Sequence, residues 1–343
     1  MERADLGLAF MLQYENVAWY EAGAVKILDR RVYPRQLSFV LCYRHEEVAQ
    51  AIADMVTQSA GPYTAAGMGM ALAAYEARNK SEEAFTAHMK SAAYILSHAR
   101  PTSTALMAKV TSDALQAAIS ARKIGQPVDQ AVMLHTIDRM NQSYTHFGTI
   151  AEYLVDKFPS HGTIMTQCFG EIIVGQMLKV AKTRQCQIKL ICPETRPYFQ
   201  GARLTATVAY DMGFDVTVIT DNMPACTMQM KKVDLFTSAA DVICMDGYVV
   251  NKVGTFQIAI AAKYLDIPYY VTGSPNKKHP SIDTVTIEER NPQDVLMAMG
   301  IPTVMEGVKG FYPAFDTTPP HLVTGVVTKK GVLSPFALDQ YYI

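Results

Sequence analysis

The chain has 343 residues, of which 49% are hydrophobic and 18% charged, and its 31 basic and 32 acidic residues give a formal net charge of -1. This apolar fraction supports a large core and argues against a disordered chain or a small disulfide scaffold. The balanced charge argues against a protein that coats nucleic acid, so any anion-binding pocket must be local. The length predicts about two domains.

The cysteine pattern and the uncharged segments indicate the compartment. The six cysteines form no CxxC pair, which favours a reducing cytoplasm over a disulfide-forming compartment. The N-terminus lacks the basic region and long apolar region of a signal peptide. The longest uncharged stretch, 55–75, contains Gly61, Pro62 and further glycines, so it is a poor membrane span. We expect a cytoplasmic protein with no membrane contact.

The first half of the chain has a helical pattern after a short β element. Apolar runs on either side of Gly23 predict a β-hairpin within 17–34. From Glu46 to Phe158, apolar residues recur at three- and four-residue spacing, which is typical of amphipathic helices. Glycine and proline turn signals separate the helices. The predicted helices cover 46–59, 64–79, 81–100, 102–124 and 127–158.

Near residues 158–160 the period changes to short apolar runs separated by helix-length segments. Near-continuous apolar strands that alternate with amphipathic helices predict a parallel sheet covered on both faces. The predicted strands are 162–168, 187–192, 214–220, either 233–239 or 241–246, and 268–273. The fold class is therefore α/β: a mainly helical domain with a small β element over 1–158, and a Rossmann-like domain with a parallel sheet over 159–343.

Ligands of open parallel sheets bind beyond the carboxyl ends of the strands. The residues at these places include Cys168, the segment 194–203, Asp221 with Asn222, and the segment 241–252. A thiol, carboxylates, amides and basic side chains thus converge on one edge of the predicted sheet. No GxGxxG or Walker motif follows any of these strands, which favours a small phosphorylated ligand over a nicotinamide cofactor.

Several motifs in this region carry a family resemblance. They are ETRPYFQGARLTA (194–206), ITDNM (219–223), AADVICMDGYVVNKVGTFQIAIAAK (239–263), TIEER (286–290) and YPAFDTTPPHLVTGVVTKKG (312–331). With these motifs the chain resembles the methylthioribose-1-phosphate isomerase family. Related proteins are the 5-deoxyribose-1-phosphate isomerases, the ribose-1,5-bisphosphate isomerases and the regulatory subunits of the initiation-factor exchange factor. The resemblance implies a homodimeric aldose–ketose isomerase that needs no cofactor.

The resemblance also implies two catalytic residues. The catalytic thiol of the family falls on Cys168, within the run TQCFG, and the catalytic carboxylate falls on Asp241. Gln167 and Phe169 stand where the family has His and Asn. Hydrophobicity alone leaves an alternative open, because a buried strand over the run VICM would place Asp246 at its carboxyl end.

Three further residues are implied to position the sugar. They are Gln200 in the run QGAR, and Asn251 with Lys252, whose amide and ammonium suit sugar hydroxyls and negative charge. Asn251 and Lys252 also open a predicted helix over 251–266, where Asn is a natural N-cap. The two roles are compatible, because helix N-termini attract anions.

The phosphate is implied to bind Arg100, since a planar guanidinium suits bidentate contacts. The family also has an Arg-Gly-Ala phosphate cradle, and this chain has Gln58 and Ser59 there, followed by Ala60. One phosphate arginine is therefore missing, and Gln58 and Ser59 are the candidates for its place.

The eight histidines show no HxH or HxxxH grouping, so no metal site is expected. The predicted substrate is a 5-substituted ribose 1-phosphate, either 5-methylthioribose 1-phosphate or 5-deoxyribose 1-phosphate, and the product is the ribulose 1-phosphate. Such a reaction serves the salvage of methylthioadenosine or of 5-deoxyadenosine by-products. The alternative is a non-catalytic regulatory module like the exchange-factor subunits.

Overall fold

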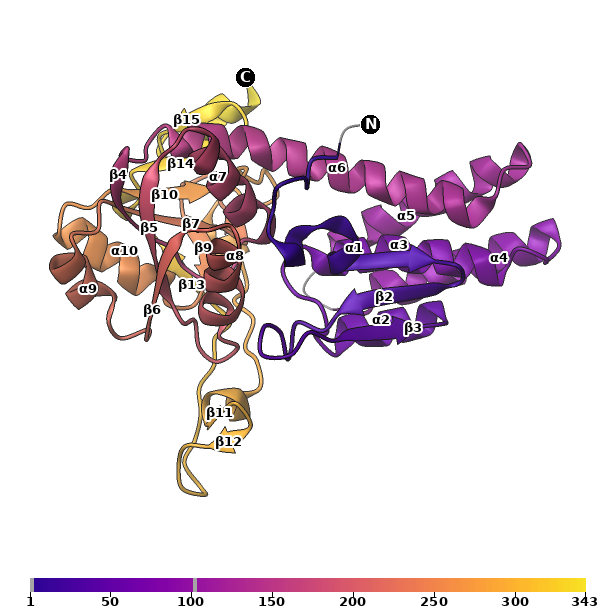
Figure 1. Ribbon diagram of the computed structural model, residues 1–343, viewed down its shortest axis with the longest axis horizontal. Helices are drawn as coiled ribbons and strands as arrows, with labels where there is room; N and C mark the ends of the chain where they lie inside the picture. Colours follow the sequence, from indigo (N-terminus) through magenta and orange to yellow (C-terminus); the bar gives the residue numbers. More distant parts are fainter. Residues whose placement is uncertain (1–2, 101–103) are drawn as a thin grey trace. The chain divides into compact units, whose positions relative to one another are not determined.

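The computed structural model describes residues 3–100 and 104–343, which form two compact units, Met1–Thr145 and His146–Ile343 (Figure 1). These are unit 1 and unit 2. The units divide within helix α6 (Val128–Val155), ahead of the boundary expected at 158 and 159. The change of period at 158–160 coincides with the end of α6 and the start of strand β4 (His161–Met165).

Unit 1 contains an antiparallel sheet of β1 (Ala18–Glu21), β2 (Ala24–Leu28) and β3 (Phe39–Cys42), in that order. The predicted hairpin is confirmed, since β1 pairs with β2 across a turn in which Ala22 and Gly23 have φ of 49° and 84°. Two consecutive positive φ values are the geometry of a tight type I′ hairpin turn, and glycine adopts it without strain.

The helices of unit 1 follow the predicted apolar spacing. Before α6 they are α1 (Tyr14–Val17), α2 (His45–Ala53), α3 (Gly61–Glu76), α4 (Glu82–Ser97) and α5 (Thr104–Lys123). Helix α2 ends earlier than residue 59, because Met55 and Ser59 take left-handed φ of 60° and 58°, which no helix continues through. Among the described residues, no helix has both the length and the apolarity needed to cross a bilayer.

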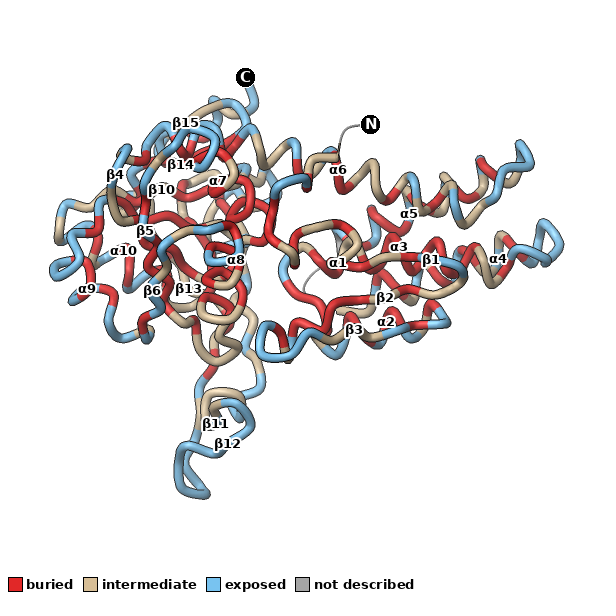
Figure 2. Tube along the Cα trace, viewed as in Figure 1, coloured by how far each residue is buried: buried red, intermediate tan, exposed pale blue. Residues whose placement is uncertain are grey.

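Helix α3 is the centre of unit 1 and is buried along most of its length (Figure 2). It contacts β1, α2, α4 and α5. A helix that is apolar on all sides is expected at such a place. Gly67 and Gly69 allow the neighbours to come close: a Cβ at Gly67 would lie 2.6 Å from Cγ2 of Thr136, and one at Gly69 would lie 3.0 Å from side-chain atoms of Leu96 and Val48.

Gly67→Ala is expected to destabilise the protein. The new methyl would overlap the Thr136 side chain, and overpacking costs about 1–3 kcal/mol, which exceeds the gain in helix propensity of about 1 kcal/mol. Gly148→Ala in α6 is the matched control, because its nearest contact would be at 3.6 Å. Thermal unfolding should show a lower Tm for Gly67→Ala and an unchanged or higher Tm for Gly148→Ala. Equal Tm values would contradict this account of α3.

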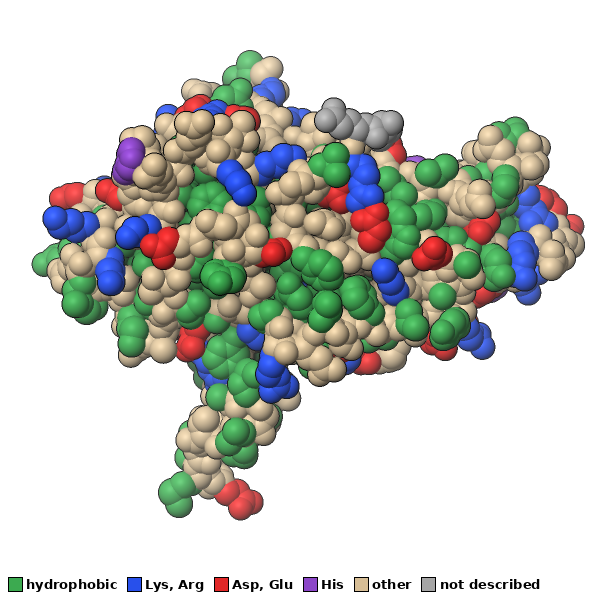
Figure 3. Space-filling view, in the orientation of Figure 1, with side chains coloured by type: hydrophobic (Ala, Val, Ile, Leu, Met, Phe, Trp, Pro, Cys, Tyr) green, Lys and Arg blue, Asp and Glu red, His purple; other side chains and the backbone are tan. Residues whose placement is uncertain are grey.

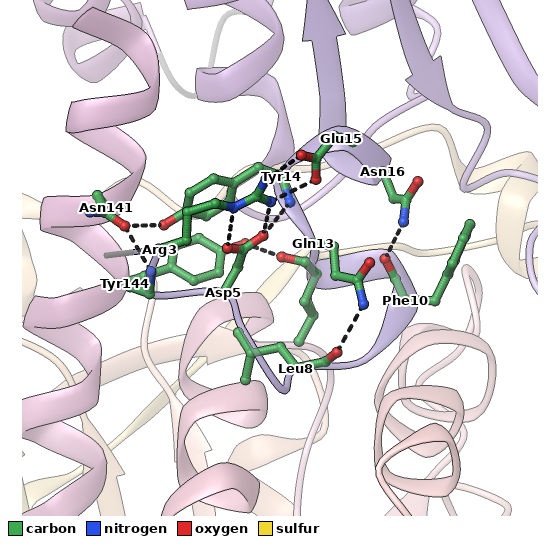
Figure 4. Close-up of polar contacts among 12 residues, drawn as sticks. Arg3, Asp5, Leu8, Phe10, Gln13, Tyr14, Glu15, Asn16, Asn141 and Tyr144 are labelled. Atoms are coloured by element: carbon green, nitrogen blue, oxygen red, sulfur yellow. Dashed lines mark hydrogen bonds and ion pairs between the residues drawn. The ribbon is translucent and has the colours of Figure 1, made fainter. Parts of the chain in front are cut away.

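A polar network fixes Arg3, Asp5 and Tyr14 against α6 (Figure 4). The Arg3 guanidinium bonds the carboxylates of Asp5 and Glu15, with Nε 2.9 Å from Oδ1 of Asp5. Asp5 is 1% exposed and accepts the Tyr14 N–H at 2.9 Å. The Tyr14 hydroxyl donates to Oδ1 of Asn141 in α6 at 2.7 Å. The buried Asp5 carboxylate is thus fully paired, as burial requires.

Unit 2 is built on a sheet of seven strands in the described chain, ordered β15-β14-β10-β7-β4-β5-β6. Beside β4, these strands are β5 (Gln187–Pro193), β6 (Asp215–Ile219), β7 (Leu235–Ala239), β10 (Tyr269–Thr272), β14 (Gly325–Thr328) and β15 (Gly331–Leu333). All neighbours are parallel except β14 and β15. Counted along the chain, the parallel strands have the Rossmann order 3-2-1-4-5-6. The predicted fold class is confirmed.

Helices cover both faces of this sheet (Figure 1). They are α7 (Glu171–Thr183) and α8 (Ala206–Asp211) on one face, and α9 (Pro224–Lys231) and α10 (Thr255–Tyr264) on the other. Met228 of α9 and Ile258 of α10 share a buried core with Phe236 and Val271 of the sheet. This two-sided cover explains why the strands are nearly continuous apolar runs.

Two further elements of unit 2 were not predicted. Strands β8 (Val242–Ile243), β9 (Val249–Lys252) and β13 (Phe315–Thr318) form a small antiparallel sheet. Residues 291–311 form a projecting arm that contains the pair β11 (Met297–Ala298) and β12 (Ile301–Pro302). The Arg196 guanidinium donates to the Met297 carbonyl in β11 at 2.6 Å.

Candidate active site

The candidate site of unit 2 lies where the strand order reverses. Strands β4 and β7 are neighbours in the sheet, but the chain leaves them for opposite directions, to β5 and to β10. A crevice opens at such a switch point, and ligands of doubly wound sheets bind there. Cys168 follows β4 and Asp241 follows β7. The parallel pairing of β4 with β7 brings these two strand ends to the same edge.

Cys168 is held in an unusual backbone conformation between β4 and α7. Its φ of 59° lies in the left-handed region, which a side chain with a Cβ rarely adopts. Its carbonyl accepts a hydrogen bond from the Thr205 hydroxyl. Burial raises the pKa of the Cys168 thiol to about 11, although the positive charge of Lys252 acts to lower it. The resting thiol is therefore protonated at neutral pH.

Asp241 is also shifted toward its protonated form. Desolvation of the carboxyl by the protein packed around it raises its pKa to about 6, although the charges of Lys252 and Arg290 act to lower it. The residue remains accessible to solvent, and its N–H donates to the Val250 carbonyl at 2.9 Å. A carboxyl with this pKa is partly protonated near neutral pH, as general acid catalysis requires.

The structure also decides which of the two candidate segments, 233–239 or 241–246, forms a strand of the parallel sheet. The parallel strand β7 is Leu235–Ala239, so the alternative buried strand over the run VICM is wrong. Val242 and Ile243 instead form the two-residue antiparallel strand β8. Asp246 lies in the turn after β8, where its carboxylate accepts the N–H groups of Tyr248 at 3.2 Å and Ile282 at 2.9 Å. Both hydrogen bonds hold loop backbone.

Asn251 and Lys252 lie on β9, so the prediction that they open a helix is wrong. They pair with Asp316 and Phe315 of β13, and the chain turns into α10 only at Gly254, whose φ is 104°. A strand partner far along the chain overrides the local helix signal. The Asn251 amide donates to the Thr255 hydroxyl at 3.1 Å.

Lys252 is a buried cation close to both predicted catalytic residues. Its side chain is 5% exposed, and its ammonium lies 5.0 Å from the centroid of the Phe315 ring. Burial lowers its pKa, while the nearby Cys168 and Asp241 act to raise it. These mutual effects on the pKa values identify Cys168, Asp241 and Lys252 as one electrostatic cluster.

Gln200 offers a buried polar atom with no partner. It is 8% exposed, and its Oε1 has no hydrogen bond among the described residues. It precedes a π-helical turn, Gly201–Thr205, and such turns are frequent at functional sites. Only glycine fits at 201, because a Cβ there would lie 1.8 Å from the Pro193 carbonyl oxygen at the end of β5. A bound polar ligand would satisfy the Gln200 amide.

Sequence reasoning missed three charged residues of this region. Arg290 pairs with Glu288, with Nε 2.9 Å from Oε1, and both influence the pKa of Asp241. Asp316 accepts the N–H groups of Gly254 at 2.6 Å and of Phe256 at 3.1 Å, at the start of α10. None of them follows a strand of the main sheet, so the rule of strand ends could not find them. The sequence features that could have identified these three residues are the motifs TIEER and YPAFDTTPP, which contain them.

The residues predicted to bind phosphate belong to unit 1. Gln58 is 5% exposed, its carbonyl accepts the Arg30 guanidinium at 2.8 Å, and its Oε1 has no partner among the described residues. Ser59 follows with a φ of 58°. Arg100 is half-buried beyond the end of α4. Cys168 and Asp241 belong to unit 2.

A shallow hollow also lies between α6 and α7 in unit 2. It is lined by residues such as Gln176, Lys179 and Arg184. Arg184 there bonds the Asp156 carboxylate at 2.6 Å and also bonds Glu152. None of the predicted site residues lines this hollow.

The comparisons with known proteins agree with these observations. The model of the "Initiation factor 2 subunit family" matches residues 58–335. A putative methylthioribose-1-phosphate isomerase of Methanocaldococcus jannaschii is 34% identical, over 90% of this chain and 92% of that protein. The solved 5-methylthioribose 1-phosphate isomerase of Pyrococcus horikoshii superimposes with a TM-score of 0.84 at 28% identity, covering 95% and 94% of the two chains.

A solved initiation factor eIF-2B subunit delta of A. fulgidus has a TM-score of 0.83 at 29% identity, covering 93% of this chain and 96% of that one. The resemblance found in the sequence is therefore confirmed. The chain belongs to the Initiation factor 2 subunit family and is a relative of the methylthioribose-1-phosphate isomerases within it.

Proposed function

We propose that the chain is an aldose–ketose isomerase that converts 5-methylthioribose 1-phosphate, or 5-deoxyribose 1-phosphate, to the corresponding ribulose 1-phosphate. The observation that carries the proposal is the pair Cys168 and Asp241 at the switch point of the sheet, both with raised pKa values. The names of the relatives support the same reaction. The isomerisation moves hydrogen and electrons within the substrate, so it needs no cofactor.

The chemistry requires an acid first. A ribose 1-phosphate is a locked acetal, and its ring opens only when the ring oxygen takes a proton as the C1–O bond breaks. Asp241, with a pKa of about 6, is the proposed donor of that proton.

Hydrogen must then move from C2 to C1, while the C2 hydroxyl loses its proton and becomes the carbonyl. It moves either as a proton taken from C2 and returned to C1, or directly as a hydride. In the proton route, we propose that Cys168 acts as a thiolate that takes the C2 proton and returns it to C1. In the hydride route it stays a neutral thiol beside these carbons. In both routes Asp241, left ionised by the ring opening, accepts the proton of the C2 hydroxyl. Gln200, Asn251 and Lys252 are the proposed contacts to the sugar hydroxyls and to developing negative charge, and all three are buried.

Arg100, Gln58 and Ser59 are the proposed contacts to the phosphate. Arg100→Ala is expected to raise KM by about 10- to 100-fold, since a hydrogen bond to a charged group contributes about 1.5–3 kcal/mol. The effect should fall on KM more than on kcat, because this contact is made in the ground state. Arg100→Lys keeps the positive charge but loses the bidentate geometry of the guanidinium, so its KM should lie between those of the wild type and Arg100→Ala. An unchanged KM in Arg100→Ala would place the phosphate elsewhere.

The reaction is tested by phosphorus NMR of the protein with 5-methylthioribose 1-phosphate, 5-deoxyribose 1-phosphate and ribose 1-phosphate, each in a separate sample. We expect a ketose phosphate from at least one of the first two, and the relative rates rank the C5 groups. No conversion of any of the three by folded protein would contradict the isomerase.

A second candidate function is a non-catalytic regulatory module. The likeness to the eIF-2B subunit, at a TM-score of 0.83, favours it. Sugar-phosphate binding without any turnover would be its signature in the same experiment.

We also propose a homodimer in the cytoplasm. All six cysteines are free thiols, which suits a reducing compartment.

The arm of unit 2 carries exposed apolar side chains (Figure 3), among them Ile301 at 68% and Met305 at 84%. Exposed apolar groups of this kind mark interaction surfaces, and a second copy of the chain is the proposed partner. A sedimentation mass of one chain would contradict the dimer.

A further inference from the structure

Three side chains of unit 1 converge outside the proposed catalytic residues. His45 is the first residue of α2, Glu76 the last of α3, and His88 lies within α4. The Nδ1 of His45 lies 2.7 Å and the Nε2 of His88 lies 3.1 Å from the same oxygen, Oε2 of Glu76. One ligand atom from each residue lies within 4.8 Å of the others.

The carboxylate between the rings is held in a fixed orientation. Its other oxygen, Oε1, accepts the backbone N–H of His45 at 2.8 Å. A carboxylate fixed by a backbone hydrogen bond on its outer oxygen is the arrangement that orients metal ligands in proteins.

The two imidazoles converge at an angle and are not stacked. Their ring centroids lie 5.1 Å apart and the ring planes meet at 77°. His45 is 2% exposed, whereas the side chains of Glu76 and His88 are 19% and 21% exposed. The cluster is therefore buried at His45 and partly exposed at Glu76 and His88, so that an ion can reach it from this side.

We propose that His45, Glu76 and His88 bind a divalent transition metal ion, Zn²⁺ by the chemistry of the ligands. Two imidazole nitrogens and one carboxylate oxygen are a common zinc ligand set. With Zn–N and Zn–O distances of about 2.0–2.2 Å, tetrahedral ligands lie about 3.3 Å apart. The pair His88 and Glu76, at 3.1 Å, is close to that separation, and His45 at 2.7 Å needs a small outward movement.

Water would complete the coordination. Oε2 of Glu46 lies 3.3 Å from Nδ1 of His45, but this carboxylate bonds Arg44 and is not one of the three converging ligands. Since the three main ligands come from three helices, the bound ion would join α2, α3 and α4. Its role would be to stabilise unit 1, apart from the chemistry proposed for unit 2.

The site is tested with Co²⁺, whose visible spectrum reports tetrahedral coordination, and with Zn²⁺ in competition, after dialysis of the protein against a chelator. We expect one Co²⁺ per chain, displaced by Zn²⁺. His88→Gln should weaken metal binding by at least about tenfold. Even replacing a residue that only hydrogen-bonds a metal ligand lowers the metal affinity by about 10–100-fold. His98→Gln is the matched control, because His98 lies at the end of the same helix and outside the cluster.

Thermal unfolding separates the metal site from a hydrogen-bonded trio that binds no ion. A bound ion stabilises only the folded state, so Zn²⁺ should raise the Tm of the wild type and of His98→Gln, and not that of His88→Gln. Glu76→Gln provides a second test if His88→Gln fails to fold. Absence of saturable binding in the wild type, or equal affinity in the cluster variants and the wild type, would overturn the proposal.

Discussion

Asp241→Asn is expected to lower kcat by about 10²–10⁴-fold, which is the usual contribution of general acid catalysis. The amide keeps the shape of the side chain but has no acidic proton to give to the ring oxygen. Steady-state kinetics with 5-methylthioribose 1-phosphate, followed by the formation of the ketose phosphate, measure the loss.

The same variant should be at least as stable as the wild type at pH 7. The Asp241 carboxyl has a folded-state pKa of about 6 against an ordinary 3.8, so the folded state binds its proton more tightly than the unfolded state does. This contribution to stability is present below about pH 3.8 and is lost as the pH rises through about 6. At pH 7 the ionised carboxylate therefore destabilises the folded state, and the neutral amide removes this destabilisation. A Tm clearly below that of the wild type would show that Asp241 is structural.

Asp246→Asn is the matched control for Asp241. Its carboxylate holds the backbone of Tyr248 and Ile282, so we expect a lower Tm and nearly full kcat. An inactive Asp246→Asn beside an active Asp241→Asn would move the acid to position 246.

Cys168→Ala is expected to reduce kcat by at least about 10²-fold, since it removes the group proposed to act at C1 and C2. Cys168→Ser keeps a hydroxyl donor, so any residual activity in Ser over Ala reports how far hydrogen bonding alone suffices. The change to Ala should leave the fold intact, because Cys168 lies in a loop and its interaction with Thr205 uses the backbone carbonyl.

Cys226→Ala is the control for Cys168, because Cys226 is an exposed free thiol on α9. We expect full activity from this variant. Full activity in Cys168→Ala as well would remove the thiol from the mechanism.

The main architecture of unit 2 could be predicted from the sequence because it is coded locally. Strands such as β4 and β5 are short apolar runs between amphipathic helices, and both faces of the sheet are covered. The positions of Cys168 and Asp241 after their strands follow from the same pattern. The order of the strands, which makes β4 and β7 neighbours, depends on pairing between distant segments and became visible only in the structure.

The elements that escaped prediction are those fixed by distant partners. Asn251 and Lys252 read as the start of a helix, but pairing with β13, more than sixty residues later in the chain, makes them a strand. Asp316, on that same strand, accepts the backbone N–H of Gly254 at the start of α10. Likewise, His45, Glu76 and His88 have no metal-binding spacing in the sequence, because their proximity depends on how α2, α3 and α4 pack.

The most direct test is a single-turnover experiment in which excess wild-type protein and excess Asp241→Asn protein each receive 5-methylthioribose 1-phosphate and, in separate samples, 5-deoxyribose 1-phosphate, with binding measured in parallel by calorimetry. We expect both proteins to bind the sugar phosphate and only the wild type to convert it to the ketose phosphate. Conversion by Asp241→Asn at the wild-type rate, or binding by the wild type without conversion of either sugar phosphate, would contradict the proposed catalytic site.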